Sequence, residues 1–273
     1  MPSVPDGFPT DQLCRIAQET FVEHLEFAAE MSSTNDRALE LISSGACHAP
    51  LLVLTERQTG GRGRGTNHWW AGPGALTCSL IIDPDLFNIS ADRRPQMSLT
   101  LGLAVCRTID RFTPAADVGL KWPNDVYING RKACGILCEV PGHGQKTLPS
   151  ASPLMVLGIG LNVNNRMTDA PQELQSQAIA LIDISQRPLP LIDVAIELLR
   201  QVESHLHTLA TDRDGLLNRW SEFDVLRNRR IWLKTCSGEA CGISRGIDTD
   251  GALLLQTDDG IERFLSATVV NWV

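Results

Sequence analysis

A glycine-rich segment with two arginines is the part of the sequence best suited to bind an anion. In residues 60–65 four glycines surround Arg62 and Arg64, and Trp69 and Trp70 follow a few positions later. Glycine lets backbone N–H groups approach a phosphate closely, arginine adds charged paired hydrogen bonds, and a tryptophan ring can cover an aromatic ligand. The segment has neither the GK[ST] ending of a P-loop nor a strand–GxGxxG–helix setting, so a plain flexible loop is the alternative.

Two further segments place polar side chains at turns. The run KWPND, residues 121–125, ends in amide and carboxylate oxygens that can hold a divalent metal or accept a proton, and Arg131 and Lys132 follow it. Residues 33–35, Ser-Thr-Asn, begin a predicted helix, where free N–H groups can bind a small polar ligand. The alternatives are a turn with a solvated aspartate and a simple helix N-cap. Taken together, the three segments suit a nucleotide phosphate with Mg²⁺ and an adenine, as in the attack of a carboxylate on the α-phosphate of ATP.

These segments must be positioned by alternating strands and helices. We expect helices over residues 10–20, 32–45, 95–112, 189–209 and 213–223, with Pro95 near the first turn of the third. We expect strands over residues 22–27, 51–56, 75–83, 119–122 and 154–164, a hairpin over 126–140 that turns at Asn129-Gly130, and a surface connection over 141–153. From about residue 228 the period changes to 2, and five short strands predict a small SH3-like barrel.

Composition excludes several classes of protein. The 273 residues are 43% hydrophobic and 21% charged, which is typical of a globular chain and not of a disordered, collagenous or coiled-coil one. A net charge of −8 gives no general reason to bind nucleic acid or an anionic membrane. The eight cysteines contain no CxxC pair, so we expect reduced, buried thiols, Cys134 and Cys138 included. No signal peptide or membrane span is predicted, and the expected location is cytoplasmic.

Six segments, in order, make the sequence similar to the biotin–protein ligases. They are Ser33-Thr34-Asn35, Gln58, the GRGR run 61–64, KWPND at 121–125, RKACGIL at 131–137 and GIGLN at 158–162. The run GIDTDGALLL, 246–255, resembles the C-terminal SH3-like domain of that family. The resemblance implies an α/β (α+β) fold: a mixed-sheet, class II-synthetase-like catalytic domain at 1–226 and an SH3-like β-barrel at 227–273. It covers the chain from about residue 31 onward.

The resemblance also implies roles for individual residues. The biotin site would comprise Ser33, Thr34, Asn35, Gln58, Gly61, Arg62, Gly63, Arg64, Lys132 and Gly135. The ATP and adenylate site would comprise Arg62, Arg64, Trp69, Lys121, Asn124, Lys132 and Asn162. The catalytic residues would be Arg64, Lys121, Lys132 and Asp125, and Asp125 would also help to hold Mg²⁺ or accept a proton.

The implied reaction has two steps. Biotin and MgATP give biotinyl-5′-AMP and pyrophosphate, and a lysine of a biotin carboxyl carrier domain then attacks the acyl carbon. Two alternatives stay open: a lipoate or octanoate ligase, and a non-catalytic biotin sensor or DNA-binding repressor. The segment before Ser33 is too short and too poor in basic residues for a helix-turn-helix module, so we expect no nucleic-acid partner. We expect a monomer or a homodimer.

Overall fold

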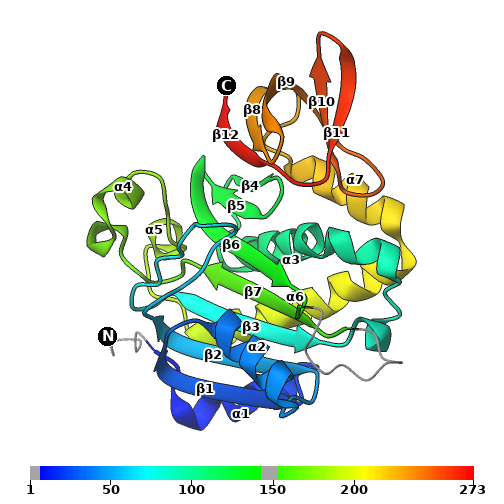
Figure 1. Ribbon diagram of the computed structural model, residues 1–273. Helices are drawn as coiled ribbons and strands as arrows, with labels where there is room; N and C mark the ends of the chain where they lie inside the picture. The colour runs from blue at the N-terminus through cyan, green and yellow to red at the C-terminus, as the bar shows by residue number, and fades with distance from the viewer. Residues whose placement is uncertain (1–6, 143–152) are drawn as a thin grey trace.

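The computed structural model describes residues 7–142 and 153–273, and they form two β-sheets with helices packed on the larger one (Figure 1). The larger sheet has the order β1-β2-β3-β7-β6-β5-β4. β1 and β2 are parallel, and every other neighbouring pair is antiparallel, which makes the sheet mixed. The strands are β1 (His24–Met31), β2 (Leu51–Gln58), β3 (Leu76–Ile82), β4 (Val118–Lys121), β5 (Asp125–Ile128), β6 (Arg131–Glu139) and β7 (Met155–Leu161).

Helices cover both faces of this sheet, because its central strands are apolar on both sides. Alternate residues of β2 face opposite ways: Leu51 and Val53 pack with α2, whereas Leu52 and Leu54 join the main core with α3 and α6. β3 and β7 are buried along their whole length. The helices are α1 (Cys14–Glu19), α2 (Thr34–Ser44), α3 (Met97–Phe112), α4 (Gln172–Gln175), α5 (Ile182–Ser185), α6 (Leu191–Thr211) and α7 (Arg213–Phe223). No helix in the two described ranges is both long and apolar enough to cross a membrane.

Local sequence signals place the chemical segments as predicted. Ser33 caps α2 by accepting a hydrogen bond from the Asp36 amide, and Gly45 ends the helix at φ 72°. The β5–β6 turn has Asn129 at φ 50° and Gly130 at φ 75°, the paired left-handed conformation of a type I′ hairpin. β4, β5 and β6 are therefore adjacent, and they carry Lys121, Asp125 and Lys132 to one end of the sheet.

The C-terminal sheet has five antiparallel strands, as the period-2 pattern predicts. Its order is β11-β10-β9-β8-β12, so β12 is an edge strand. The strands are β8 (Arg230–Thr235), β9 (Gly238–Ile247), β10 (Leu253–Thr257), β11 (Gly260–Phe264) and β12 (Thr268–Trp272). Figure 1 shows β12 directly above the ends of β4, β5 and β6.

Hydrogen bonds fix the C-terminal sheet to the larger unit. Trp122 Nε1 donates to the Gly251 carbonyl at 3.0 Å, and the Val225 amide donates to the Leu120 carbonyl at 3.0 Å. Asp224, beside Val225, accepts a hydrogen bond from the Leu226 amide, but its Oδ2 has no partner among the described residues. Burial raises the pKa of the Asp224 carboxyl to about 6. The segment 224–226, which leads into the C-terminal sheet, therefore packs against β4, the strand that carries Lys121.

Four details differ from the sequence predictions. The first helix is a 3₁₀ helix, Thr10–Gln12, followed by α1. β1 extends to Met31, because Met31 pairs with Gln58 on β2. Pro95 lies in the 3₁₀ helix Ala91–Gln96, and α3 begins only at Met97.

The fourth detail concerns the cysteines and the connections. All eight cysteines are free, but Cys14, Cys236 and Cys241 are exposed, so burial was wrong for these three. Cys134 is buried and Cys138 is partly so. The short helices α4 and α5 were not predicted, and most of the predicted connection 141–153 lies outside the described residues.

Candidate functional site

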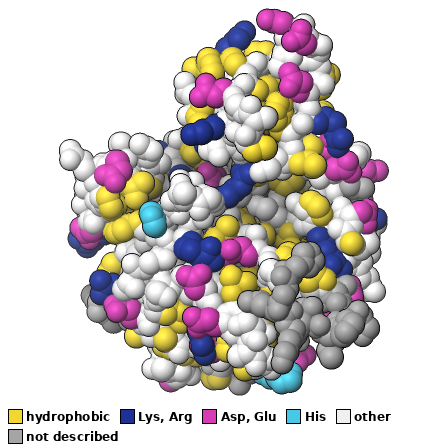
Figure 2. All heavy atoms as spheres, in the orientation of Figure 1, with side chains coloured by type: hydrophobic (Ala, Val, Ile, Leu, Met, Phe, Trp, Pro, Cys, Tyr) yellow, Lys and Arg dark blue, Asp and Glu magenta, His cyan; other side chains and the backbone are white. Residues whose placement is uncertain are grey.

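A cleft of about 350 Å³ lies between the larger sheet, the glycine-rich loop and β12. It brings together most of the residues that the sequence analysis selected: Ser33, Thr34, Asn35, Gln58, Arg62, Gly63, Arg64, Trp69, Lys121, Asn124, Asp125, Lys132 and Gly135. Thr268 and Val269 of β12 complete its wall. Figure 2 shows Lys and Arg side chains in the hollow between the larger unit and the C-terminal sheet. The cleft is therefore polar and rich in cations although the chain as a whole is acidic.

The α2 end of the cleft is a set of buried and half-buried polar side chains that hydrogen-bond to one another. Gln58 Oε1 accepts hydrogen bonds from the Thr34 amide at 2.8 Å and from its hydroxyl at 3.1 Å. Ser79 Oγ lies 2.7 Å from Thr34 Oγ1 and 2.6 Å from Asn35 Oδ1. Asn35 Nδ2 donates to Glu139 Oε2 at 2.7 Å. This end can therefore offer both donors and acceptors in fixed positions to a small, flat polar ligand.

Arg62 lies at the same end, with its charge balanced by two carboxylates. Its guanidinium donates two hydrogen bonds to Glu139, at 3.0 and 2.6 Å, and its Nε lies 2.7 Å from Asp36 Oδ1. The Glu139 hydrogen bond is the main cause of a raised pKa for Arg62. Through Glu139, the arginine also fixes the amide of Asn35. Arg62 therefore orders the α2 end of the cleft.

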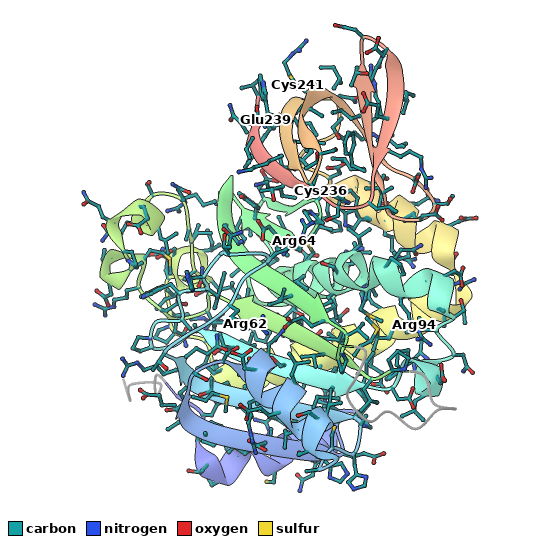
Figure 3. All side chains as sticks on the ribbon, viewed as in Figure 1. Arg62, Arg64, Arg94, Cys236, Glu239 and Cys241 are labelled. Carbon is teal, nitrogen blue, oxygen red and sulfur yellow. The ribbon has the colours of Figure 1, made fainter. Side chains whose placement is uncertain are left out.

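Arg64 reaches in the opposite direction, as Figure 3 shows. Its guanidinium donates to the Ala267 carbonyl at 2.7 Å and to Ser266 Oγ at 2.5 Å, both just before β12. Burial lowers the pKa of Arg64, and the charge of Asp125 opposes that shift. The two arginines of one loop thus contact different parts of the molecule, and Arg64 ties the loop to the C-terminal sheet.

Two lysines and an aspartate lie on β4, β5 and β6. Lys132 Nζ is 2.6 Å from Asp125 Oδ1, and the two side chains are 35% and 16% exposed. Lys121 Nζ lies instead over the ring of Trp272, 4.5 Å from its centroid. Burial lowers the pKa of Lys121; Asp125 opposes this shift and Lys132 adds to it. Asn124 also faces the cleft, and its Nδ2 donates to the Ile136 carbonyl at 2.7 Å.

Trp69 lies flat against glycines of β6 and β7. A Cβ at Gly160 would be 2.5 Å from Trp69 Cε2, and a Cβ at Gly135 would be 3.3 Å from Cε3. A Cβ at Gly61 would be 2.5 Å from the Trp69 carbonyl oxygen, which explains the glycine there. Only glycine leaves room for the indole at Gly160.

A second pocket, of about 330 Å³, opens on the other side of Trp69. Trp70, Tyr127 and Asn162 help to line it, and Asn162 is the one predicted site residue found in this pocket and not in the first. Asn162 is buried; its Nδ2 donates to the Ile179 carbonyl at 3.2 Å, and its Oδ1 accepts from Asn165. Trp69 and Lys132 line both pockets, so they stand where the two spaces meet.

Comparison with known proteins gives consistent relatives over most of the chain. Residues 27–154 match the biotin/lipoate A/B protein ligase family, and residues 228–272 match the biotin protein ligase C-terminal domain. A biotin–[acetyl-CoA-carboxylase] ligase of Mycobacterium tuberculosis is 32% identical over 85% of this chain and 82% of its own length. One from Paracoccus denitrificans is 30% identical over 88% and 98%. This chain belongs to the biotin protein ligase family.

Solved structures of the family have the same fold. The biotin protein ligase of Aquifex aeolicus, solved in complex with biotin and ATP, has a TM-score of 0.75 and 26% identity, covering 89% of this chain and 96% of that one. This match confirms the expected mixed α/β fold.

A bifunctional ligase/repressor of Bacillus spizizenii is similar in sequence, with 31% identity over 92% of this chain and 75% of its own length.

The cleft of this biotin protein ligase suits an Mg²⁺ ion that is held jointly by one carboxylate and the phosphates of a nucleotide. The described residues contain no cluster of three or more His, Cys, Asp or Glu side chains that could enclose a metal ion by themselves. Mg²⁺ is commonly bound by one or two carboxylates together with substrate phosphates. Asp125, with one oxygen on Lys132, has a second oxygen available for such a role.

Sequence reasoning missed several residues of this ligase site. Ser79 looks like an ordinary polar residue in a buried strand, and only its position opposite α2 gives it a role. Glu139 ends the predicted hairpin without a motif of its own. Thr268, Val269 and Trp272 lie in β12, whose alternating sequence pattern predicts only a strand of the barrel. No local signal could have found them, because each acts through contacts distant in sequence.

Proposed function

We propose that this chain is an ATP-dependent biotin protein ligase that forms biotinyl-5′-AMP and transfers biotin to a lysine of a biotin carboxyl carrier domain. The observation that carries the proposal is the position of Lys132 at the junction of the two pockets. A carboxylate held in the first pocket and an α-phosphate held beside the second would meet at this ammonium. The relatives named biotin–[acetyl-CoA-carboxylase] ligase support the same reaction.

We place the substrates by the chemistry of the walls. The ureido ring of biotin would lie at the α2 end, against Thr34, Asn35 and Gln58, whose hydrogen-bonding groups are already fixed. The adenine would lie in the second pocket against Trp69, with Asn162 in its wall. Arg64 and Lys121 would face the phosphates.

In the first step a carboxylate oxygen of biotin attacks the α-phosphorus, and the bond to pyrophosphate breaks. Lys132 stabilises the charge that develops on the phosphate oxygens as pyrophosphate leaves, since a fixed ammonium needs no reorganisation. Asp125 holds Lys132 in place at 2.6 Å and would share Mg²⁺ with the phosphates. When bound, Mg²⁺ supplies further neutralisation of phosphate charge.

In the second step the acceptor lysine attacks the acyl carbon and AMP leaves. The amine must lose a proton, and the Asp125 carboxylate in the cleft would accept it. The glycine-rich loop covers the cleft through Trp69 and Arg64, and this cover would keep water from the reactive anhydride. The described residues supply these functions without a covalent acyl-enzyme.

Two organisational statements belong to the proposal. Residues 1–226 would form the catalytic domain and 227–273 the second domain, supported by the separate sheets and family matches. The chain would act in the cytoplasm, which the eight unpaired cysteines support, since reduced thiols persist there.

The test is incubation with MgATP, biotin and a purified carrier domain, followed by mass spectrometry of the acceptor lysine. We expect a mass gain of one biotinyl group, and biotin-dependent ATP–pyrophosphate exchange without any carrier. Lipoate and octanoate are run in parallel. Exchange with either of these acids but not with biotin would replace the proposal by a lipoate-type ligase, and no exchange with any acid would refute a ligase.

A further inference from the structure

The C-terminal sheet reaches into the cleft through its edge strand, β12. Thr268 and Val269 line the cleft, and Trp272, three residues further along, lies over Lys121. β12 pairs only with β8, so its other edge is turned to the larger unit, as Figure 1 shows. The strand therefore supplies side chains to a site whose other walls belong to the larger sheet and its loop.

Lys121 is bound in a way that differs from Lys132. Lys132 has the carboxylate of Asp125 at 2.6 Å, whereas no carboxylate of residues 7–142 and 153–273 lies within 4.0 Å of Lys121 Nζ. The Lys121 ammonium has aromatic neighbours: the Trp272 ring centroid at 4.5 Å and the Tyr127 centroid at 5.9 Å. An indole face attracts a cation through its quadrupole without neutralising its charge.

The two rings also hold each other. Tyr127 and Trp272 meet edge to face, with centroids 5.8 Å apart and planes at 85°. Such a pair fixes the orientation of both rings. Lys121 therefore rests on a rigid aromatic support, and its full positive charge stays available to an anion in the cleft. A carboxylate partner would have cancelled that charge.

We propose that Trp272 is a positioning residue for adenylate formation, which holds the Lys121 ammonium where the phosphates of ATP bind. The proposal rests on the proposed function, because it requires ATP in the cleft. It makes the C-terminal sheet a part of the adenylation site and not only a docking surface for the carrier. Trp272 touches Lys121 and also lines the second pocket, but it does not touch the reacting atoms.

The experiment compares Trp272→Leu and Trp272→Phe with the wild type in biotin-dependent ATP–pyrophosphate exchange. A cation–π contact of about 0.5–2 kcal/mol corresponds to about a 2–30-fold change. We expect Trp272→Leu to lower kcat/KM for MgATP within that range and to change the KM for biotin by less than about twofold. Trp272→Phe keeps an aromatic face and should retain most of the activity.

The pH profile separates positioning from a general structural effect. Trp272 favours the charged form of Lys121, so its loss should lower the pKa of that lysine and shift the alkaline limb of kcat/KM to lower pH. The matched control is Trp232→Leu. Trp232 is also half-buried, lies on the neighbouring strand β8, and lines a groove of the C-terminal sheet with Val270 and Cys241, of which Figure 3 labels Cys241. We expect this variant to keep wild-type kinetics.

A double variant completes the test. In a Lys121→Met background, Trp272→Leu should cause no further loss of kcat/KM for MgATP, since its target is already absent. Full additive loss, or a folded Trp272→Leu with wild-type kinetics and pH profile, would overturn the proposal while the wild-type exchange still supports the ligase. If Trp272→Leu fails to fold, Trp272→Met takes its place with the same expectations. Absence of exchange in the wild type would refute the ligase function itself.

Discussion

Replacing Gly160 by alanine should move the indole of Trp69, because the added methyl group meets that ring first. The new Cβ would lie 2.5 Å from both Cε2 and Nε1 of the indole and 2.9 Å from Cζ2. Carbon atoms in ordinary contact are about 3.5–4.0 Å apart, so the ring must withdraw by about 1 Å. Gly160 pairs with Thr77 and Gly135 inside the sheet and has no left-handed φ, so alanine causes no backbone strain there. The cost falls on the tryptophan.

The expected effect is weaker binding of ATP. Stacking of a base on an aromatic side chain contributes about 1–3 kcal/mol, which corresponds to about 5–150-fold in affinity. We therefore expect Gly160→Ala to raise the KM for ATP by about 5–150-fold in biotin-dependent ATP–pyrophosphate exchange. The KM for biotin should change less than the KM for ATP, because Trp69 also lines the first pocket but the polar set at the α2 end of the cleft is untouched.

Two neighbouring glycines provide graded controls. A Cβ at Gly135 would lie 3.3 Å from the Trp69 ring, so Gly135→Ala should have a smaller effect. A Cβ at Gly60 would lie 3.5 Å from the Ser32 carbonyl oxygen, an ordinary contact, so Gly60→Ala should keep the wild-type KM for ATP. If Gly160 acts through Trp69, adding Gly160→Ala to Trp69→Ala should cause no further loss. An unchanged KM for ATP in folded Gly160→Ala, or additive losses in the double variant, would refute the reasoning.

Three further predictions follow from other contacts. Lys132→Ala should slow adenylate formation by about 10²–10³-fold in pyrophosphate exchange. Lys132→Arg should not restore the rate, since the site holds a compact ammonium beside Asp125. A loss below about twofold in Lys132→Ala would refute a catalytic role for Lys132. Arg64→Gly removes the tie to the C-terminal sheet and the charged contact to phosphate that we propose, so adenylate should dissociate about 10–150-fold faster in a filter-retention assay. Arg57→Gly, whose salt bridge with Glu30 is exposed, should match the wild type. The buried Asp224 carboxyl has its pKa raised to about 6, so the protonated form stabilises the fold; this contribution is complete below the ordinary value near 4 and is lost as the pH rises through 6. Denaturant titrations of the wild type and Asp224→Asn give two free energies of unfolding at each pH. The value for Asp224→Asn minus that for the wild type should increase by up to about 3 kcal/mol between pH 4 and pH 7.5. If this difference does not change with pH, the raised pKa of Asp224 is wrong.

Much of the fold could be predicted because local signals and their positions agree. The apolar run at residues 51–56 favours a buried strand, and Asn129-Gly130 favours a two-residue hairpin turn; the structure has β2 and the β5–β6 turn there. Ser33 and Gly45 mark both ends of α2. The strand boundaries were predicted less accurately where a pairing partner decides them. Met31 belongs to β1 because it pairs with Gln58 on β2, which its own sequence does not indicate.

Most of the selected residues lie in one cleft, but their contacts could not be predicted. The motif residues Lys121, Asp125 and Lys132 meet in one cleft, as expected from their strands. The salt bridges of Arg62 with Glu139 and Asp36, however, depend on a loop conformation that no short sequence pattern encodes. The same holds for Trp272 over Lys121, because 151 positions separate these residues and the barrel pattern specifies only alternation.

Because Trp69 and Lys132 line both pockets, we expect that biotin and ATP, placed there as proposed, would not bind independently. A ligand in the first pocket would contact the same indole and ammonium that the ligand in the second pocket meets, so each would change the wall offered to the other. Thermodynamic linkage makes this effect symmetrical: the factor by which biotin tightens ATP binding equals the factor by which ATP tightens biotin binding. Calorimetric titrations in both orders must therefore give the same coupling free energy, and an ordered kinetic mechanism would reflect only which pocket opens to solvent first.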